Sequence, residues 1–239
     1  MIRMRKPLNT ESLRQLNLLL PSPIDVIIDV GVQYSTPFLM ECFPDAFHYL
    51  IEPVVIYHGS IRNNYIKAGI KFNLIEAAAS DVEGVLFQHL QCLDDSGTIT
   101  HSQLLDAANN NLQGLIRIDN TPVITLDSTF TDLSNYLVKI DVDGIEEKII
   151  RGGVKTIRGA SVVIIEATLG SLISRASLLK SMGMTLFDIT DMCYYYGQLQ
   201  QVDLIFVNSS VSKGDLNFQP LVKYSPIVWA EWHKYGLSS

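Results

Sequence analysis

Runs of aliphatic residues recur along the chain and are separated by amphipathic segments. The run over residues 24–30 is almost continuously aliphatic, which is typical of a strand buried on both faces of a parallel sheet. Further strands are predicted at 47–51, 72–79, 136–141, 161–167, 184–189 and 194–208. Helices are predicted at 36–43, 55–68, 144–153 and 169–182.

Strands that alternate with helices at this spacing predict βαβ units with right-handed crossovers. We therefore expect an α/β fold with a mainly parallel, twisted sheet, helices on both faces, and a late strand that pairs back on the sheet antiparallel. Residues 84–125 are less regular, with hairpin-like pieces at 85–90, 116–118 and 123–125, and are read as a variable insertion.

The domain organisation follows from length and composition. A chain of 239 residues with 47% hydrophobic and 18% charged residues fits a single domain at 23–239. Residues 1–22 read as a helical leader capped at Thr10, since their apolar run is too short for a secretory signal or a membrane span. The late segment 229–233 is read as a packing or dimer segment, which leaves a homo-oligomer open.

Charge and cysteine content narrow the function classes. The net charge is −7 without a long basic run, which argues against nucleic acid as a partner, because such binding depends on Lys and Arg at the phosphates. Three widely spaced cysteines indicate neither a disulfide framework nor a zinc cluster. The expectation is a cytoplasmic protein that acts without a membrane.

Acidic residues stand at the ends of nearly all the predicted parallel strands. In such folds ligands bind outside the carboxyl ends of the strands. One acid there is explained by helix capping, but the set is not, because each buried carboxylate costs solvation free energy. The strand-end acids are Asp29, Glu52, Asp81, Asp141 and Glu166.

The loop after the first strand separates two kinds of cofactor. A pyrophosphate needs glycine amides at a helix N-terminus, but Gln33, Tyr34 and Ser35 follow Gly31 here. The acidic residues at the strand ends instead suit a cationic ligand with hydroxyl groups and no phosphate, such as S-adenosylmethionine. Glu52 suits the ribose hydroxyls of either cofactor and does not discriminate between them.

Residues 138–153, VKIDVDGIEEKIIRGG, closely resemble the signature of FkbM-type S-adenosylmethionine-dependent methyltransferases. Residues 28–31, 123–128 and 201–207 resemble further segments of that family in the same order. The resemblance implies a Rossmann-like class I methyltransferase fold. The chain departs from the family at 33–35, where members often have Asn-x-Gly, and at Asp143, where many have Glu or Gln.

The resemblance also implies roles in cofactor binding. Asp29 and Gly31 would lie against the methionine part, with Ser35 closing the turn. Glu52 would hold the ribose diol. Ser80 and Asp81 would border the adenine.

Roles on the acceptor side are implied in the same way. Asp141 would face the sulfonium or the acceptor and act in catalysis, with Asp143 and Glu146 beside it. Apart from the resemblance, the strand-end acid Glu166 and Tyr195 in the late strand are candidates for acceptor binding, and the alternative for Tyr195 is packing against the sheet. His101, in the irregular segment, is a candidate base, against the alternative of a solvent-exposed histidine.

A metal ion is a separate hypothesis. Asp141, Asp143 and Glu166 could converge as oxygen ligands of a divalent cation such as Mg²⁺. The alternative is that Asp141 lies on the cofactor side and Asp143 caps the next helix.

The expected function is methyl transfer from S-adenosylmethionine to a hydroxyl group of a small molecule, such as a sugar or a natural-product scaffold. Two alternatives stay open. One is a non-catalytic binding or assembly protein that keeps the fold, and the other is a nicotinamide-dependent oxidoreductase.

Overall fold

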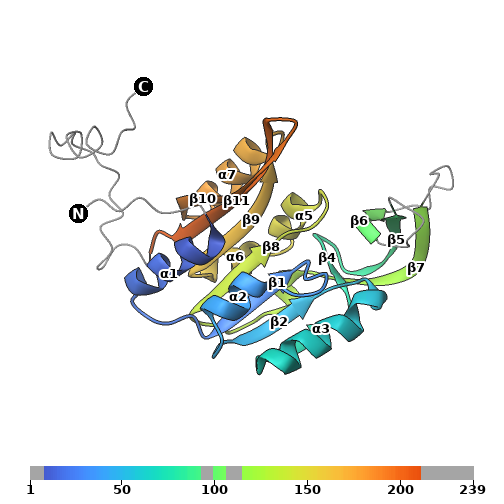
Figure 1. Cartoon of the computed structure of the whole chain (residues 1–239), viewed down its shortest axis with the longest axis horizontal. Coiled ribbons are helices and arrows are strands. Elements are labelled where there is room, and N and C mark those ends of the chain that lie inside the picture. The colour runs from blue at the N-terminus through green and yellow to red at the C-terminus, as the bar shows by residue number, and fades with distance from the viewer. Residues whose placement is uncertain (1–7, 93–98, 106–114, 211–239) are drawn as a thin grey trace, which may run out of the picture.

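The computed structural model describes residues 8–92, 99–105 and 115–210. Within these ranges the side chains of residue 89 and of residues 91–92, 99–105 and 115–119 are not described. The segment 229–233, read above as a packing or dimer segment, lies outside the described residues. Figure 1 shows a central sheet flanked by helices, with a smaller sheet on its right side.

Seven strands form the central sheet. Its order is β10 (Met184–Tyr195), β11 (Gln198–Asn208), β9 (Val162–Thr168), β8 (Tyr136–Ile140), β1 (Val26–Val30), β2 (Phe47–Ile51) and β3 (Lys71–Ile75). The pairs from β9 to β3 are parallel, whereas β11 is antiparallel to both β9 and β10. The predicted fold class is therefore confirmed, including the antiparallel late strand.

The chain order reverses next to the first strand. β1 pairs with β2 on one side and with β8 on the other, so successive units are built outward in both directions. This is the switch point at which open α/β sheets place their ligands. The loops that leave β1, β2 and β8 therefore meet at one edge.

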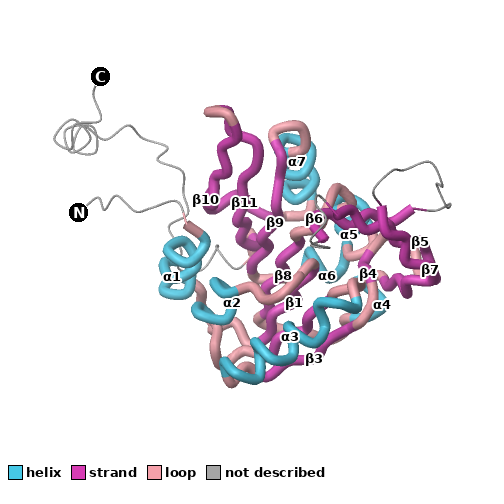
Figure 2. The backbone as a smooth tube through the Cα atoms, turned by 45° about the vertical axis from the view of Figure 1, so that its right-hand side comes forward, coloured by secondary structure: helices cyan, strands magenta, loops and turns pink. Residues whose placement is uncertain are grey.

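Helices cover both faces of the sheet (Figures 1 and 2). The N-terminal helices α1, α2 and α3 pack on one face and the later helices α5, α6 and α7 on the other. The helices are α1 (Asn9–Leu19), α2 (Pro37–Cys42), α3 (Val55–Ala68), the short α4 (Leu126–Thr129), α5 (Glu146–Arg151), α6 (Val154–Gly159) and α7 (Leu172–Ser181).

Alternation along each strand decides which residues meet which helices. Ile28 and Val138 lie in the core cluster with α5, α6 and α7, whereas Ile27 and Leu137 lie in the cluster with α1 and α2. Because side chains alternate between faces, Asp29 and Lys139 share the face of Ile27 and Leu137.

One predicted strand is divided between two sheets. The expectation of a single strand over residues 72–79 is wrong, because β3 ends at Ile75 and β4 (Ala78–Ala79) pairs with another sheet. The turn between them is tight, since the N–H of Ala77 donates to the carbonyl of Ile75 at 2.9 Å. The second sheet has the order β4, β7 (Leu115–Ile124), β5 (Gly84–Cys92) and β6 (Ile99–Leu105), so the irregular segment is a sheet of its own.

Two other boundaries differ from the expectation. The helix predicted at 144–153 begins only at Glu146, and a second helix, α6, follows the glycines that end it. Asp127 caps α6 from a distance, because its carboxylate accepts the N–H groups of Lys155 and Thr156 at 3.0 and 2.8 Å. The predicted last strand is also a hairpin: Tyr196 and Gly197 have φ of 50° and 75° and turn β10 into β11.

The first helix belongs to the hydrophobic core. Leu13 and Leu16 of α1 are fully buried in the cluster that includes Leu137. The cap expected at Thr10 is wrong, since the helix begins at Asn9 and its N-cap, Leu8, makes no side-chain cap. None of the helices in the described ranges is long and apolar enough to span a bilayer.

Candidate functional site

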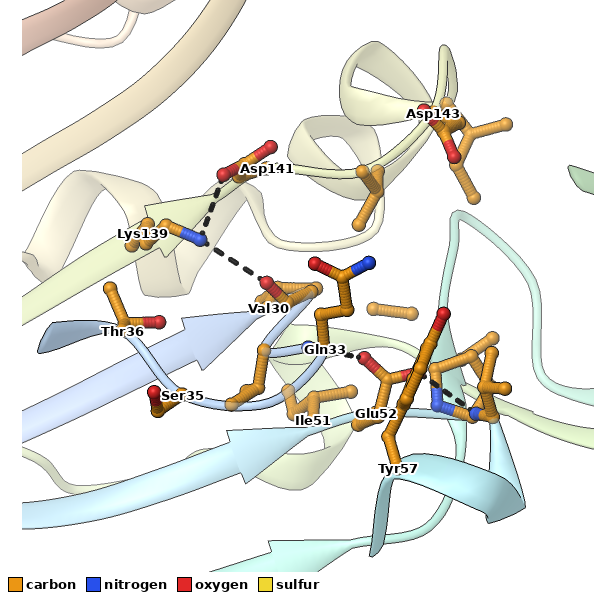
Figure 3. A pocket seen from close by; sticks show the side chains of 18 of the residues that line it. Val30, Gln33, Ser35, Thr36, Ile51, Glu52, Tyr57, Lys139, Asp141 and Asp143 are labelled. Carbon is orange, nitrogen blue, oxygen red and sulfur yellow. Dashed lines mark hydrogen bonds and ion pairs between the residues drawn. The ribbon is translucent and has the colours of Figure 1, made fainter. Parts of the chain in front are cut away.

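A cavity of about 360 Å³ lies across the carboxyl ends of β1, β2 and β8 and reaches β4 and β5. This volume lies in the range of small-molecule sites. Its polar lining residues are Gln33, Ser35, Thr36, Glu52, Tyr57, Gln88, Lys139, Asp141 and Asp143. Figure 3 shows Lys139 and Asp141 at one side of the site and Glu52 and Tyr57 at the other.

The loop after β1 needs only one glycine. Gly31 has φ of +84°, and a Cβ there would lie 1.9 Å from the carbonyl oxygen of Asp141, so no other residue fits. Gln33 adopts the left-handed conformation itself, with φ of 55°. The loop therefore turns without the second glycine that a pyrophosphate loop carries.

Glu52 is fixed by backbone amides at the end of β2. It is 4% exposed, and its two carboxylate oxygens accept the N–H groups of Gln33 at 2.8 Å and Val54 at 2.9 Å. Burial raises the pKa of Glu52, and the two N–H donors oppose that rise. Each oxygen keeps a second lone pair for a ligand.

Lys139 connects β8 to the loop after β1. Its ammonium lies 3.1 Å from Asp141 Oδ2 and 3.4 Å from Asp29 Oδ1, and it donates to the carbonyl of Gly31 at 3.2 Å. The register explains the contact, because Asp29 and Lys139 are paired across β1 and β8. Burial alone would lower the pKa of Lys139, but the carboxylates of Asp29 and Asp141 raise it above its ordinary value.

Asp29 lies behind the loop and does not line the cavity. Its side chain is fully buried and its Oδ2 accepts the hydroxyl of Thr36 at 2.5 Å. The contact of its Oδ1 with Lys139 is an ion pair without hydrogen-bond geometry. Gly31, Ser35, Glu52 and Asp141, also predicted for the cofactor, do line the cavity.

Ser80 and Asp81 lie beside the cavity and not on its wall, where Ala78 and Ala79 stand instead. Asp81 Oδ2 is 3.6 Å from Nε of Arg151, and its Oδ1 accepts the hydroxyl of Ser80 at 3.2 Å. A Cβ on Gly152 would lie 2.0 Å from the carbonyl oxygen of Ser80. The glycine of the signature therefore lets the end of α5 pack against this turn.

The residues predicted for acceptor binding are separated. Asp143 lines the cavity, whereas Glu146 is 1% exposed and forms an ion pair with Arg175. Arg175 also donates to the carbonyl of Glu166 at 2.6 Å. Tyr195 is 65% exposed in the β10–β11 hairpin, away from the cavity lining.

His101 lies in β6, and its side chain is not among those described. Its role as a base stays a prediction. Among the side chains that the structure describes, no group of three or more His, Cys, Asp or Glu residues lies close enough together to hold a metal ion.

Glu166 belongs to a row of carboxylates on neighbouring strands. Glu166 is paired with Asp203 of β11 and accepts a hydrogen bond from the side-chain amide of Gln201. On its other side, Ile165 is paired with Ile140 of β8, so Glu166 and Asp141 follow a pair of neighbouring residues. Burial, and next the charge of Asp141, raise the pKa of Glu166 to about 8. Burial likewise raises the pKa of Asp203 to about 6, although the hydrogen bond from the side-chain amide of Asn9 lowers it.

Replacing Glu166 with glutamine is expected to change how stability depends on pH. Because its folded-state pKa is raised above 4.5, the contribution of Glu166 to stability is present below pH 4.5 and lost as the pH rises through about 8. The difference in unfolding free energy should therefore shift in favour of the variant between about pH 5 and pH 8. Urea denaturation across this range measures it, and a constant difference would contradict the raised pKa.

Five of the nine polar lining residues had no role in the sequence-based prediction: Gln33, Thr36, Tyr57, Gln88 and Lys139. Tyr57 and Gln88 gave no signal, because one lies on an ordinary helix and the other in the irregular segment. In the sequence, Gln33 was noted only because it stands where a pyrophosphate loop carries glycine, yet its N–H donates to the Glu52 carboxylate. Lys139 could have been found, since a lysine within an otherwise aliphatic strand must have buried acidic partners.

Comparisons with known proteins agree with this architecture. The family model described as "Methyltransferase FkbM domain" matches residues 25–183. The crystal structure of methyltransferase FkbM from Methylobacillus flagellatus KT superposes with a TM-score of 0.55 and 14% identity, covering 84% of this chain and 48% of that one. This chain thus spans about half the length of the Methylobacillus protein.

A second similar structure is the METTL16 MTase domain, with a TM-score of 0.50 and 11% identity over 82% of this chain and 65% of that one. At such identities the structural likeness shows a shared Rossmann-like methyltransferase fold and nothing finer. A comparison of the sequence with curated proteins found no match. The match of the family model over most of the chain shows that this protein belongs to the FkbM methyltransferase family.

Proposed function

We propose that this protein transfers a methyl group from S-adenosylmethionine to a hydroxyl group of a small molecule. The observation that carries the proposal is the buried Glu52 carboxylate in the cavity wall, fixed by two N–H donors, beyond a loop that needs a single glycine. Family membership supports methyl transfer, and the cavity supports the cofactor.

The cavity fits the ribose of this cofactor. The N–H groups of Gln33 and Val54 orient the Glu52 carboxylate, and its two oxygens can each accept one hydroxyl of a vicinal diol. The apolar walls Ile51, Val54 and Ala79 beside it suit a flat, uncharged base.

The other end of the cavity fits a cation. Asp141 carries a side chain that is 40% exposed, and Lys139 neutralises only part of the charge shared by Asp29 and Asp141. A carboxylate placed in this way attracts the α-amino group or the sulfonium of S-adenosylmethionine. Gly31 lets the loop backbone approach this end closely.

The cofactor supplies a methyl group made electrophilic by the positive sulfur. When a hydroxyl accepts it, an oxygen–carbon bond forms, the carbon–sulfur bond breaks, and the hydroxyl proton must leave. Asp141 is the accessible carboxylate on the cavity wall at that end, and we assign it the role of proton acceptor. Its pairing with Lys139 holds the carboxylate in place.

Replacing Glu52 with glutamine is expected to weaken binding of S-adenosylhomocysteine, the demethylated cofactor, about 10- to 100-fold. An amide presents only one oxygen, so one of the N–H donors at Gln33 and Val54 loses its acceptor and the diol loses one contact. Calorimetry measures the affinity. The control is Glu41→Gln, an exposed acid on α2 paired with Arg14, which should bind like the wild type. Equal affinity of the Glu52 variant would exclude its role at the ribose.

Transfer itself is tested with cofactor labelled in the methyl group. The protein is incubated with panels of sugars and hydroxylated natural-product scaffolds, with and without Mg²⁺, and labelled product is counted. Labelled ethers support the proposal, and dependence on Mg²⁺ decides the metal question. Cofactor binding without transfer to any acceptor of the panel would support the alternative of a non-catalytic binding protein.

A further inference from the structure

Three acids stand side by side on neighbouring strands at the Asp141 end of the cavity. Glu166 of β9 is paired with Asp203 of β11 and, through the register of β8 and β9, lies beside Asp141. Because side chains alternate along a strand, these acids share the face of Lys139. Neighbouring strands lie about 4.8 Å apart, so each carboxylate of this row is close enough to repel the next.

In the two rows of this face nearest the cavity, the described side chains supply one ammonium and four carboxylates. Lys139 forms ion pairs with Asp141 and with Asp29, its partner on β1. The four carboxylates are those of Asp29, Asp141, Glu166 and Asp203. Like charges at such separations, partly removed from water, do not all ionise together, so these rows keep a proton at neutral pH.

Glu166, in the middle of the row, is the group that keeps the proton. The carboxylates of Asp141, Glu146 on α5 and Asp203 act on it from three elements. The guanidinium of Arg175 on α7 pairs with Glu146 and donates to the main-chain carbonyl of Glu166. The side chains of Glu166 and Asp141 also hydrogen-bond to each other, which two carboxyl groups can do only while one of them is protonated. With its pKa raised to about 8 by burial and these charges, Glu166 holds a proton at pH 7.

We propose that Glu166 exchanges its proton for the positive sulfur of the cofactor. S-adenosylmethionine brings a sulfonium to Asp141, and Glu166 then loses its proton to the solvent, so the charge of the row and its ligand stays constant. When the methyl group is transferred, the sulfur becomes neutral and the proton of the acceptor hydroxyl passes from Asp141 to Glu166. The whole cycle releases one proton, as methyl transfer from a sulfonium to a hydroxyl requires. This inference rests on the proposed function.

The exchange distinguishes the substrate form of the cofactor from its product. S-adenosylmethionine and S-adenosylhomocysteine differ in charge at the sulfur, next to the row. An ionised Glu166 attracts the sulfonium, whereas a protonated Glu166 leaves nothing extra to hold the neutral product. Preference for S-adenosylmethionine should therefore rise as the pH approaches about 8 and level off above it.

Calorimetry at pH 7 in two buffers of different ionisation enthalpy counts the protons released when each cofactor binds. The wild type should release nearly one proton more with S-adenosylmethionine than with S-adenosylhomocysteine. Its preference for S-adenosylmethionine should rise by up to about tenfold for each pH unit below about 8. Glu166→Gln should bring both effects close to zero, whereas Glu83→Gln, an exposed acid before β5, should keep them. Ionisation of the free ligands is the same for every variant and cancels in this comparison.

Asp203→Asn serves where Glu166→Gln does not fold, because asparagine keeps an oxygen for the amide of Asn9, which donates to Asp203 at 2.5 Å. Without the charge of Asp203, Glu166 ionises at lower pH, so fewer protons should be released at pH 7 while thermal melting shows a folded protein. If S-adenosylmethionine binds without the extra proton release, or a folded variant of either kind keeps the wild-type count, the exchange is refuted and the proposed function stands. If the wild type binds neither cofactor, the proposed function fails, and the exchange fails with it.

Discussion

Replacing Lys139 with methionine is expected to lower the free energy of unfolding by about 3 to 5 kcal/mol. The ammonium is buried and contacts Asp29, whose side chain is fully buried on β1. Removing the cation leaves that carboxylate in the protein interior with only the hydroxyl of Thr36 as a hydrogen-bond donor among the described side chains. Urea denaturation followed by circular dichroism at pH 7 measures the change.

Two further variants separate this cause from a general loss of packing. Lys180→Met removes an exposed lysine from the end of α7 and should change stability by less than about 0.5 kcal/mol. Adding Asp29→Asn to the Lys139 variant should restore part of the loss, because the uncompensated charge is gone. A Lys139→Met protein as stable as the wild type would show that the buried pair does not hold β1 against β8.

Replacing Asp141 with asparagine is expected to reduce turnover about 100-fold or more, while affinity for S-adenosylhomocysteine changes far less. Asparagine has the same shape and keeps an oxygen for Lys139, but it cannot take the proton of an acceptor hydroxyl. Methyl transfer at saturating cofactor measures turnover, and calorimetry measures affinity.

Asp132→Asn is the matched control for Asp141→Asn. Asp132 is exposed in a turn with φ of 58°, a conformation that asparagine also tolerates, and it does not line the cavity. This variant should keep wild-type turnover. Full activity of Asp141→Asn would refute the assignment of Asp141 as the proton acceptor.

Local rules predicted the elements of the central sheet well. The strand at Phe47–Ile51 and the helix at Val55–Ala68 have their predicted bounds. The helix ends there because Gly69 adopts a left-handed conformation, with φ of 73°, that other residues rarely take. The bounds of these elements were predictable because aliphatic runs and a single glycine specify them within a few residues of sequence.

Partners distant in sequence were not predictable in the same way. β4 leaves the strand before it and pairs with β7, more than forty residues later in the sequence, and α6 is capped by Asp127 from outside the helix. Neither partner leaves a local trace in the pattern of apolar residues. For the same reason nothing marked Gln88 as part of the cavity.

Some of the acids at the strand ends lie where their sequence positions predicted, and others do not. The topology brings Glu52, Asp141 and Asp143 to one cavity, as their positions after parallel strands predicted. Asp29 and Glu146 are instead buried against Lys139 and Arg175. Which acid faces a ligand depends on strand alternation and on cations from other elements, and a strand-end position alone does not decide it.

Calorimetric titration of the wild-type protein with S-adenosylmethionine, and in parallel with NAD, decides which of the two cofactors the cavity binds. The cavity across the ends of β1, β2 and β8 should give saturable binding of S-adenosylmethionine and no heat with NAD, because the loop after β1 lacks the second glycine of a pyrophosphate-binding loop. Absence of binding to S-adenosylmethionine, or binding of NAD alone, would contradict the account.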